Sequence, residues 1–107
     1  MKTVLIKNLD VMNERKPCLR PATSLFNYYR DNVDALNRIE APKDVLAQKL
    51  NVSRRTLSNW IHALVNSGVI KYKYSGSARL NPNIYFNGLK KNYDKAVIEF
   101  DRFHSDL

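Results

Sequence analysis

The chain has 107 residues, with 18 Lys and Arg against 10 Asp and Glu, and a formal net charge of +8. This length suits a single domain with a modest core. With three glycines, one cysteine and two histidines that lie far apart, the sequence excludes a Gly-rich phosphate loop, an internal disulfide and a Cys/His metal site. We therefore expect no enzyme, no cofactor, no metal and no small-molecule ligand.

The positive charge is confined to one region of the sequence. Residues 45–93 contain no Asp or Glu, and the remaining residues carry as many basic as acidic side chains. The basic residues of this window are Lys49, Arg54, Arg55, Lys71, Lys73, Arg79, Lys90 and Lys91. Charge segregated in this way indicates a polyanionic partner, usually nucleic acid, that meets one region of the protein. A basic but inert surface is the alternative.

Before this window, the sequence predicts an arm and then a helix. Residues 1–20 hold a short apolar run, suited to an arm or an edge strand, followed by a charged loop that contains Pro17. Residues 21–38 carry apolar side chains at helical spacing, which predicts a helix that supports the rest of the domain. Those side chains are Leu25, Phe26, Tyr29, Val33 and Leu36. The connection at residues 39–42 can add a short strand to a later hairpin.

Residues 43–68 predict a helix-turn-helix. The first helix has an apolar stripe, Asn51 breaks it, and Ser53 is a good N-cap for the second helix. The second stripe consists of Leu57, Trp60, Ile61, Leu64 and Val65. Gly68 supplies a left-handed residue at the end of this helix. A helix, a short turn and a capped helix form the helix-turn-helix arrangement.

The face opposite this second stripe carries Arg55, Asn59, His62 and Asn66 and no acid. Arg pairs with guanine edges and Asn with adenine edges, whereas Ser and Thr reach phosphates or bases. A simple solvated surface is the alternative, and for His62 we expect a phosphate contact at most. The candidate DNA-binding residues of this segment are Ser53, Arg54, Arg55, Thr56, Ser58, Asn59 and His62.

Residues 69–88 predict a basic β-hairpin, or wing. After Gly68 the apolar period changes from that of a helix to that of a strand, and Ser75–Ser77 is a turn. Ile84–Phe86 is a second apolar and aromatic run. The hairpin can lie along the phosphates that flank the recognition helix. Its candidate DNA contacts are Lys71, Lys73, Ser77 and Arg79, whereas Tyr72 and Tyr74 are expected to pack on the domain.

Residues 89–107 predict a C-terminal helix with one apolar face, which consists of Tyr93, Ala96, Val97, Phe100 and Phe103. Small DNA-binding proteins often dimerise outside the helix-turn-helix, because two half-sites multiply affinity. We therefore predict a homodimer through the C-terminal or the N-terminal segment. In the alternative, the aromatic side chains complete the core of a monomer.

Two segments resemble known families. The string LNVSRRTLSNWIHALVNSGVIKY resembles the recognition segment of prokaryotic winged helix-turn-helix proteins. The string SARLNPNIYFNG, in which Asn-Pro precedes an aromatic strand and a glycine, is similar to RepL-type plasmid replication proteins, and the strand-like start at residues 3–7 fits their layout. The resemblance implies binding at an origin or operator. It also implies a DNA-reading role for Arg54, Arg55, Thr56, Ser58 and Asn59.

Together these patterns predict a mainly α domain with a small β-hairpin wing, an α+β winged helix-turn-helix over residues 1–107. We expect it to bind double-stranded DNA in plasmid or phage replication. No apolar run is long enough to cross a membrane and no secretory leader is apparent, which predicts a cytoplasmic protein at the nucleoid or plasmid. The alternatives are a transcriptional repressor of the same fold, and a winged helix that serves RNA or protein binding.

Overall fold

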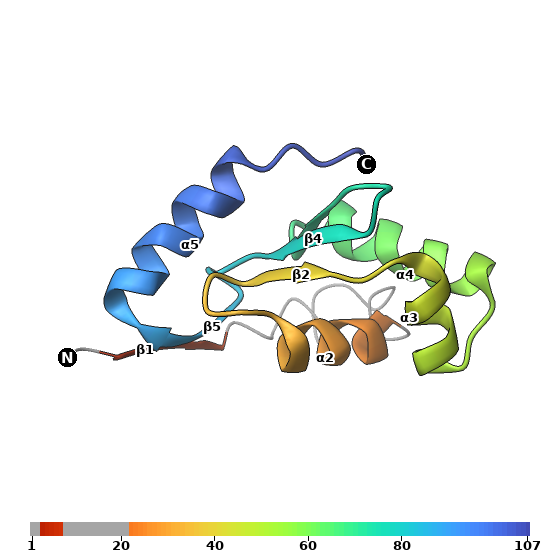
Figure 1. The fold of residues 1–107 in the computed structure, drawn as a ribbon, viewed down its shortest axis with the longest axis horizontal. Coiled ribbons are helices and arrows are strands. Elements are labelled where there is room, and N and C mark those ends of the chain that lie inside the picture. The colour runs from red at the N-terminus through yellow and green to blue at the C-terminus, as the bar shows by residue number, and fades with distance from the viewer. Residues whose placement is uncertain (1–2, 8–21) are drawn as a thin grey trace.

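The computed structural model describes residues 3–7 and 22–107. The charged loop predicted around Pro17 and Cys18 lies outside these ranges. In chain order the elements are β1 (Thr3–Lys7), α2 (Thr23–Asn32), β2 (Arg38–Glu40), α3 (Lys43–Leu50), α4 (Arg54–Asn66), β3 (Ile70–Tyr72), β4 (Ser77–Leu80), β5 (Tyr85–Leu89) and α5 (Lys90–Arg102) (Figure 1). Helices and antiparallel sheets thus make a small α+β domain. No helix in the described ranges is long and apolar enough to span a membrane.

The core lies between the helices α2, α3 and α4 and one face of a three-stranded sheet. The strand order is β2-β4-β3, all antiparallel, with Ile39 opposite Ala78 and Ile70 opposite Leu80. Alternate residues of each strand are buried, as expected for a sheet with one face on the core. The helices contribute fully buried side chains to the same cluster, among them Leu25, Tyr29, Leu46, Leu57, Ile61 and Leu64.

Residues 43–68, for which we predicted a helix-turn-helix, contain the two helices α3 and α4, separated by a short turn. Asn51 ends α3 in the left-handed conformation, at φ 54°. Ser53 caps α4, because its hydroxyl oxygen accepts the Thr56 backbone N–H at 3.1 Å. Gly68, at φ 74°, follows the end of α4. These local signals were readable from the sequence, and they orient α4 with its polar face away from the core.

The predicted support helix is shorter than residues 21–38. Helix α2 ends at Asn32, and the chain turns before β2 begins at Arg38. The Asp34 carboxylate accepts the backbone N–H groups of Leu36 and Arg38, both at 2.9 Å. Asn37 takes a positive φ of 58° within this turn. Side-chain acceptors of this kind compete with helical hydrogen bonds, which is why the apolar spacing does not extend the helix to Leu36.

The second strand predicted for the wing divides into two parts. The hairpin consists of β3 and β4, whereas Tyr85–Leu89 forms β5 and pairs with β1 in a separate two-stranded sheet, with Leu5 opposite Asn87. Asn81 redirects the chain between the two sheets, because its backbone oxygen accepts the N–H groups of Ile84 and Tyr85. The buried Asn37 amide links the sheets by donating to the carbonyls of Leu80 and Tyr85, at 3.2 and 2.8 Å.

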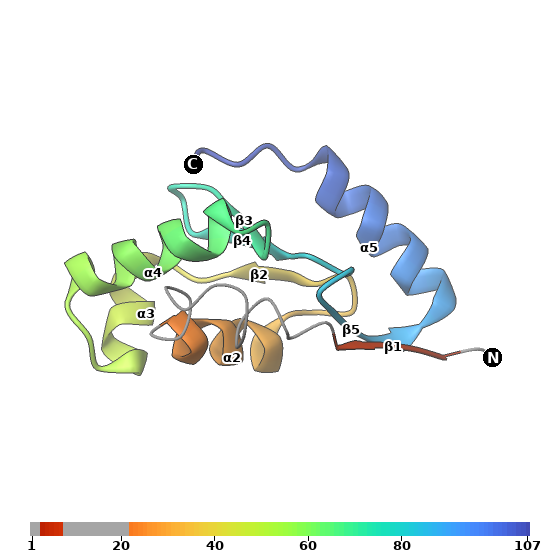
Figure 2. The ribbon, with the colours of Figure 1, turned by 180° about the vertical axis from the view of Figure 1, so that it is seen from behind.

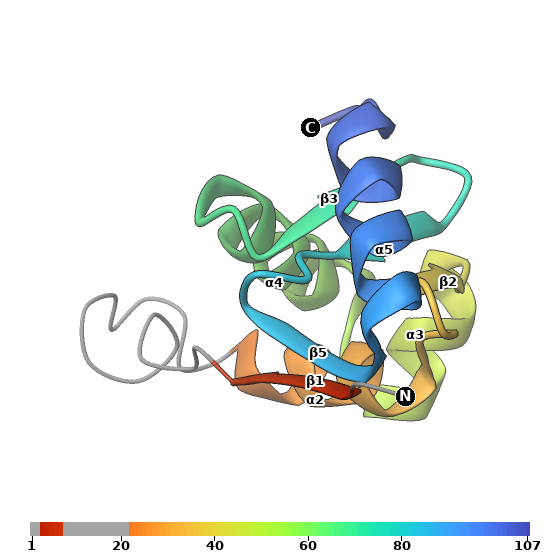
Figure 3. The ribbon, with the colours of Figure 1, turned by 90° about the vertical axis from the view of Figure 1, so that its left-hand side faces the viewer.

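Helix α5 packs on the β1–β5 sheet, at the end of the long axis opposite the N-terminus of α4 (Figures 2 and 3). The Tyr93 ring meets the Phe86 ring edge-to-face at 5.3 Å between centroids, and its hydroxyl donates to Asn83 at 2.8 Å. The helix ends at Arg102, before the predicted end at residue 107. The last residues run beside β3, where Asp106 N–H donates to the Tyr72 carbonyl at 2.8 Å.

Candidate nucleic-acid interface

The outer face of α4 is a polar surface that no acid interrupts. Arg55, Asn59, His62 and Asn66 are all exposed, whereas Leu57 on the opposite face is fully buried. The 3.6-residue period therefore placed these side chains correctly. An exposed helix usually mixes Glu with Lys for intrahelical pairs, but α4 contains no Asp or Glu. This face can approach a polyanion without electrostatic repulsion from its own side chains.

The N-terminus of α4 adds positive charge beside that face. Arg54 forms an ion pair with Asp44 at 3.2 Å, and both side chains are largely exposed. Exposed pairs of this kind are weak, so Arg54 can exchange Asp44 for a phosphate at little cost. The positive end of the helix dipole favours an anion at the same place. The hydroxyl of Ser53 is occupied locally, since it donates to the Thr56 hydroxyl at 3.0 Å while it caps the helix.

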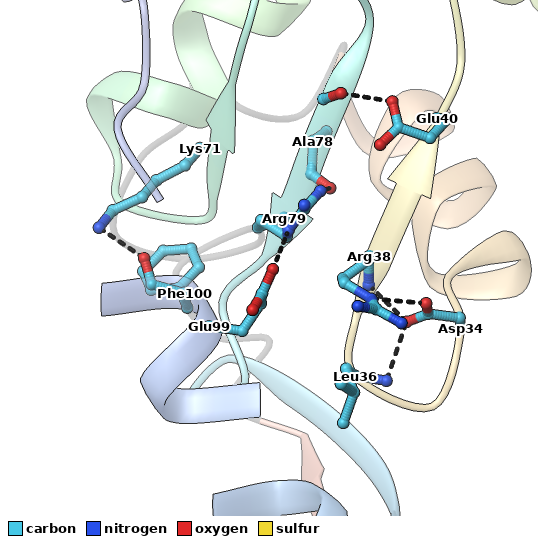
Figure 4. Close-up of polar contacts among 10 residues, drawn as sticks. Asp34, Leu36, Arg38, Glu40, Lys71, Ala78, Arg79, Glu99 and Phe100 are labelled. Carbon is cyan, nitrogen blue, oxygen red and sulfur yellow. Dashed lines mark hydrogen bonds and ion pairs between the residues drawn. The ribbon is translucent and has the colours of Figure 1, made fainter. Parts of the chain in front are cut away.

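The predicted cations of the wing face α5 instead of projecting from the hairpin. Lys71 Nζ donates to the Phe100 carbonyl at 2.8 Å (Figure 4). Arg79 Nε lies 3.3 Å from a carboxylate oxygen of Glu99, and the Arg79 side chain is only 13% exposed. The Phe103 ring has Lys73 Nζ at 4.8 Å and the Arg79 guanidinium at 4.4 Å from its centroid. All three cations thus already have partners in the C-terminal segment.

Pairing within the sheet explains why these cations need partners. Arg38 on β2, Arg79 on β4 and Lys71 on β3 stand directly opposite one another in register. Like charges in opposing positions destabilise a sheet. Each cation has its own compensation: Asp34 lies 2.8 Å from Arg38, Glu99 pairs with Arg79, and a carbonyl near the end of α5 accepts from Lys71. The C-terminal half of α5 therefore supplies the partners of two of the three cations, a carboxylate for Arg79 and a carbonyl for Lys71.

The pKa of Asp34 reflects its hydrogen bonds with Arg38, the first of these pairs. Partial burial raises the pKa of its carboxyl, but hydrogen bonds from the backbone and side chain of Arg38 and from the backbone of Leu36 outweigh that effect. The net result is a pKa below the usual value for Asp. Next to this pair, the Ser77 hydroxyl donates to the Glu40 carboxylate. Ser77, another predicted DNA contact, is therefore also engaged within the domain.

Solvent still reaches Arg79, the middle residue of this row. A cleft of about 300 Å³ opens between β4 and the end of α5, and Lys73, Arg79 and Arg102 are among the residues that line it. Sequence reasoning missed this arrangement, because the counter-charges Asp34 and Glu99 lie outside the acid-free window but beside it in space. Within the ranges that the structure covers, no group of three or more His, Cys, Asp or Glu side chains is placed to hold a metal ion.

Two further side chains near α4, those of Tyr74 and Lys43, were not among the predicted DNA contacts. Tyr72 is fully buried, as expected, but Tyr74 at the β3–β4 turn is 66% exposed. Lys43, at the start of α3, lies with its Nζ 6.0 Å from the Tyr74 ring centroid. Lys43 precedes Asp44, so the limits of the acid-free window left it out of the basic region.

The fold and these surfaces define a class of protein: a small basic α+β domain with a polar, acid-free helix face exposed on its surface. The chain belongs to the RepL family, since the family model for Firmicute plasmid replication proteins (RepL) matches residues 2–106. This match confirms the resemblance found in the SARLNPNIYFNG segment, and it gives the chain a role in plasmid replication. Neither the curated proteins nor the solved structures yielded a significant match.

Proposed function

We propose that this protein is a winged helix-turn-helix that binds duplex DNA during the initiation or control of plasmid replication, in the cytoplasm where the plasmid lies. The observation that carries the proposal is the outer face of α4, where Arg55 and Asn59 are exposed one helical turn apart and no acid is present. An α-helix fits the major groove of B-DNA, in which Arg and Asn can each pair with a purine edge.

The order of elements supports the winged-helix assignment. A helix, a strand, the two helices α3 and α4, and the hairpin β3–β4 follow one another, with β2 joined to the hairpin through β4. This arrangement fixes α4 on the core and leaves its polar face outside. We propose that Arg55 and Asn59 read bases, while Arg54, Thr56 and Ser58, in the N-terminal half of α4, and His62 further along the helix contact the phosphate backbone. Ser53 acts mainly by capping the helix.

The wing cations have to break contacts within the domain before they can contact DNA. Lys71, Lys73 and Arg79 stay predicted phosphate contacts, but each has to exchange its present contact with α5 or Phe103 for a phosphate. The cleft beside Arg79 and Arg102 gives an anion access for that exchange. We therefore assign these residues a secondary place in binding, behind the side chains of α4.

Dimerisation also remains a proposal. The α5 face that we predicted as a dimer surface is largely used within the domain, since Ala96 and Phe103 are buried and Tyr93 packs on Phe86. The large apolar side chains that stay exposed at this end are Leu5 on β1, 60% exposed, and Ile98 on α5, 51% exposed. If two copies associate to bind two half-sites, these positions are the proposed contacts.

The experiment that tests the function selects bound sites from random duplex DNA and compares the selected duplex with its single strands and with duplex RNA. We expect the protein to prefer duplex DNA, because the A-form major groove is too narrow for α4. Asn59→Ala should relax the preference at one base position, by about 1–3 kcal/mol of discrimination, while nonspecific affinity stays nearly constant. Arg55→Ala should relax a neighbouring position and also lower affinity for all sequences.

The outcome that would remove the proposal is specific. Folded Asn59→Ala and Arg55→Ala proteins that keep the wild-type preference at every position would exclude α4 as the reading element. Equal or tighter binding of duplex RNA would favour an RNA-binding winged helix. Placement of the selected site at a promoter and away from the origin would favour a transcriptional repressor.

A further inference from the structure

The β3–β4 turn is fixed to the rest of the domain by its backbone. Gly76, at φ 101°, donates to the Lys73 carbonyl at 2.9 Å, and its own carbonyl accepts the Ala41 N–H at 3.0 Å. Tyr74 N–H donates to the Asp106 carboxylate at 2.9 Å. The turn is therefore held to the start of α3 on one side and to the C-terminal segment on the other, so the position of the Tyr74 backbone is set before any partner arrives.

The Tyr74 side chain nevertheless projects into solvent. At 66% exposed, it has the highest exposed fraction of the large apolar side chains in the described ranges. Turn positions usually hold Gly, Asn, Asp, Pro or Ser, because these residues suit the backbone and tolerate water. A large ring on a fixed backbone loses little conformational entropy when a partner covers it, and such rings are efficient contact residues.

Lys43 places a positive charge beside the Tyr74 ring, and its neighbour Asp44 contacts the start of α4. Its Nζ lies 5.8 Å from the Tyr72 ring centroid and 6.0 Å from that of Tyr74. The next residue, Asp44, pairs with Arg54 at the first position of α4. The turn, the start of α3 and the start of α4 thus meet in one area, at the end of the molecule opposite β1 and α5 (Figures 1 and 2).

We propose that Lys43 and Tyr74 form a second DNA contact beside the groove that α4 reads. The Lys43 ammonium pairs with a backbone phosphate, and the Tyr74 ring packs against the adjoining deoxyribose. Unlike Lys71 and Arg79, neither side chain has to leave a contact with α5 in order to do so. This inference rests on the proposed function, because it extends the duplex-binding surface of α4 to the flanking DNA.

The test measures binding by fluorescence anisotropy as a function of salt, on two duplexes that contain the selected site. The long duplex extends on both sides of the bases that respond to Arg55 and Asn59, and the short one ends at those bases. The variants are Lys43→Gln, which removes the charge but keeps part of the aliphatic side chain, Tyr74→Ala and Tyr74→Phe. The matched control for the loss of a charge is Lys95→Ala on α5, and Tyr74→Phe and the wild type are the references for Tyr74→Ala.

On the long duplex, Lys43→Gln should weaken binding and reduce the log–log salt slope by about 0.9, the value for one lost phosphate contact. Tyr74→Ala should weaken binding about fivefold without a change of slope, since no charge is lost and removal of the contact made by the ring costs roughly 1 kcal/mol. Tyr74→Phe should bind like the wild type. On the short duplex all of these proteins should bind alike, because the flanking backbone is missing.

The inference is overturned if Lys43→Gln binds the long duplex with the affinity and slope of Lys95→Ala, and Tyr74→Ala binds it like the wild type. It is also overturned if their losses persist unchanged on the short duplex. Thermal unfolding of each variant separates loss of contact from loss of fold. A failure of the proposed function looks different, because then Arg55→Ala and Asn59→Ala would leave base preference intact. If the Lys43 and Tyr74 variants bind like the wild type while Arg55→Ala and Asn59→Ala change the base preference as expected, this inference is overturned and the proposed function is not.

Discussion

Arg79 of β4 and Glu99 of α5 lie 3.3 Å apart, Nε to carboxylate oxygen, in a pair of which the arginine is only 13% exposed. The same guanidinium stacks on Phe103 and stands opposite Lys71 and Arg38 in the sheet. Glu99 therefore stands where a phosphate would stand if Arg79 contacted DNA. As long as α5 holds Glu99 beside Arg79, the positive charge of Arg79 is not free to bind a phosphate.

Replacing Glu99 tests whether Arg79 contributes to DNA binding. Glu99→Gln removes the counter-charge, so a guanidinium that binds phosphate should be released for that role. We expect the affinity for the selected duplex to rise about two- to fivefold at low salt, with a steeper salt dependence, by the electrostatic argument of counterion release. Anisotropy titrations at several salt concentrations measure both quantities.

The control for this prediction is Asp101→Asn, which removes the same charge from an exposed position on the same helix. That change raises affinity only through the overall charge of the protein. If Glu99→Gln and Asp101→Asn have equal effects, Arg79 stays on the sheet in the complex. Its role is then to hold α5.

Gly76→Ala should destabilise the domain more than Gly68→Ala, although both glycines have positive φ. A Cβ on Gly76 would lie 2.9 Å from the Cα and N atoms of Pro42, whereas a Cβ on Gly68 would meet nothing within 4 Å. Gly68→Ala should therefore cost about 1 kcal/mol, from backbone strain alone. Gly76→Ala should cost about 2–4 kcal/mol, because the backbone of residues 41–42 must also shift.

Urea unfolding curves give both free energies of unfolding. Equal losses for the two variants would mean that the turn is not seated on Pro42. In that case the fixed position of Tyr74 would have no basis, and the turn would be free to move away from α3.

The local features of the fold could be predicted from the sequence, because each depends on neighbouring residues. The cap at Ser53, the left-handed Gly68 and the exposed face with Arg55 and Asn59 all follow from spacing along one helix. The end of α2 could not be predicted from apolar spacing, since the Asp34 carboxylate overrides it by capping a turn.

The long-range features could not be predicted from the sequence, for a different reason. The pairing of β1 with β5 and of Glu99 with Arg79 depends on how α5 packs on the sheets, which no local period encodes. The acid-free window was a property of sequence order, whereas electrostatics depends on distance in space. Tyr74 illustrates the same limit, because strand alternation does not reveal where a strand ends and its last aromatic residue turns outward.

Acid should remove the stability that Asp34 contributes. Its pKa in the folded protein is below the usual value of about 3.9, so its contribution is fully present above that pH and is lost as the pH falls through the folded pKa. Asp34→Asn should lower the free energy of unfolding at neutral pH by on the order of 1 kcal/mol, a modest loss because Asp34 and Arg38 are both 44% exposed.

The difference between the wild type and Asp34→Asn should stay constant from neutral pH down to about pH 5, and it should shrink below about pH 4. Chemical denaturation at a series of pH values measures it. A difference that grows on acidification would have the wrong sign for a carboxyl with a lowered pKa, and it would disprove the role given to the Asp34–Arg38 pair.

Tyr29 and Tyr72 provide a test of the core. The hydroxyl oxygens of both are buried and, among the residues that the structure describes, have no hydrogen-bond partner. Removing a buried hydroxyl without a partner leaves no other group unsatisfied, so Tyr29→Phe and Tyr72→Phe should be neutral or stabilising by up to about 1 kcal/mol. The same chemical change in Tyr93→Phe should be destabilising by roughly 0.5–1.5 kcal/mol, because that hydroxyl donates to Asn83.

Alkaline pH adds a second measurement on Tyr29. Burial raises the pKa of this hydroxyl, and the neighbouring hydroxyls of Tyr72 and Tyr28 raise it further. A group with a raised folded pKa contributes stability that is complete below its unfolded pKa of about 10 and is lost as the pH rises above that value. The wild type should therefore lose stability above about pH 10, and Tyr29→Phe should lose less. Parallel losses in the two proteins would show that folding does not raise the pKa of Tyr29. A clear destabilisation by Tyr29→Phe at neutral pH would show that the hydroxyl has a hydrogen-bond partner.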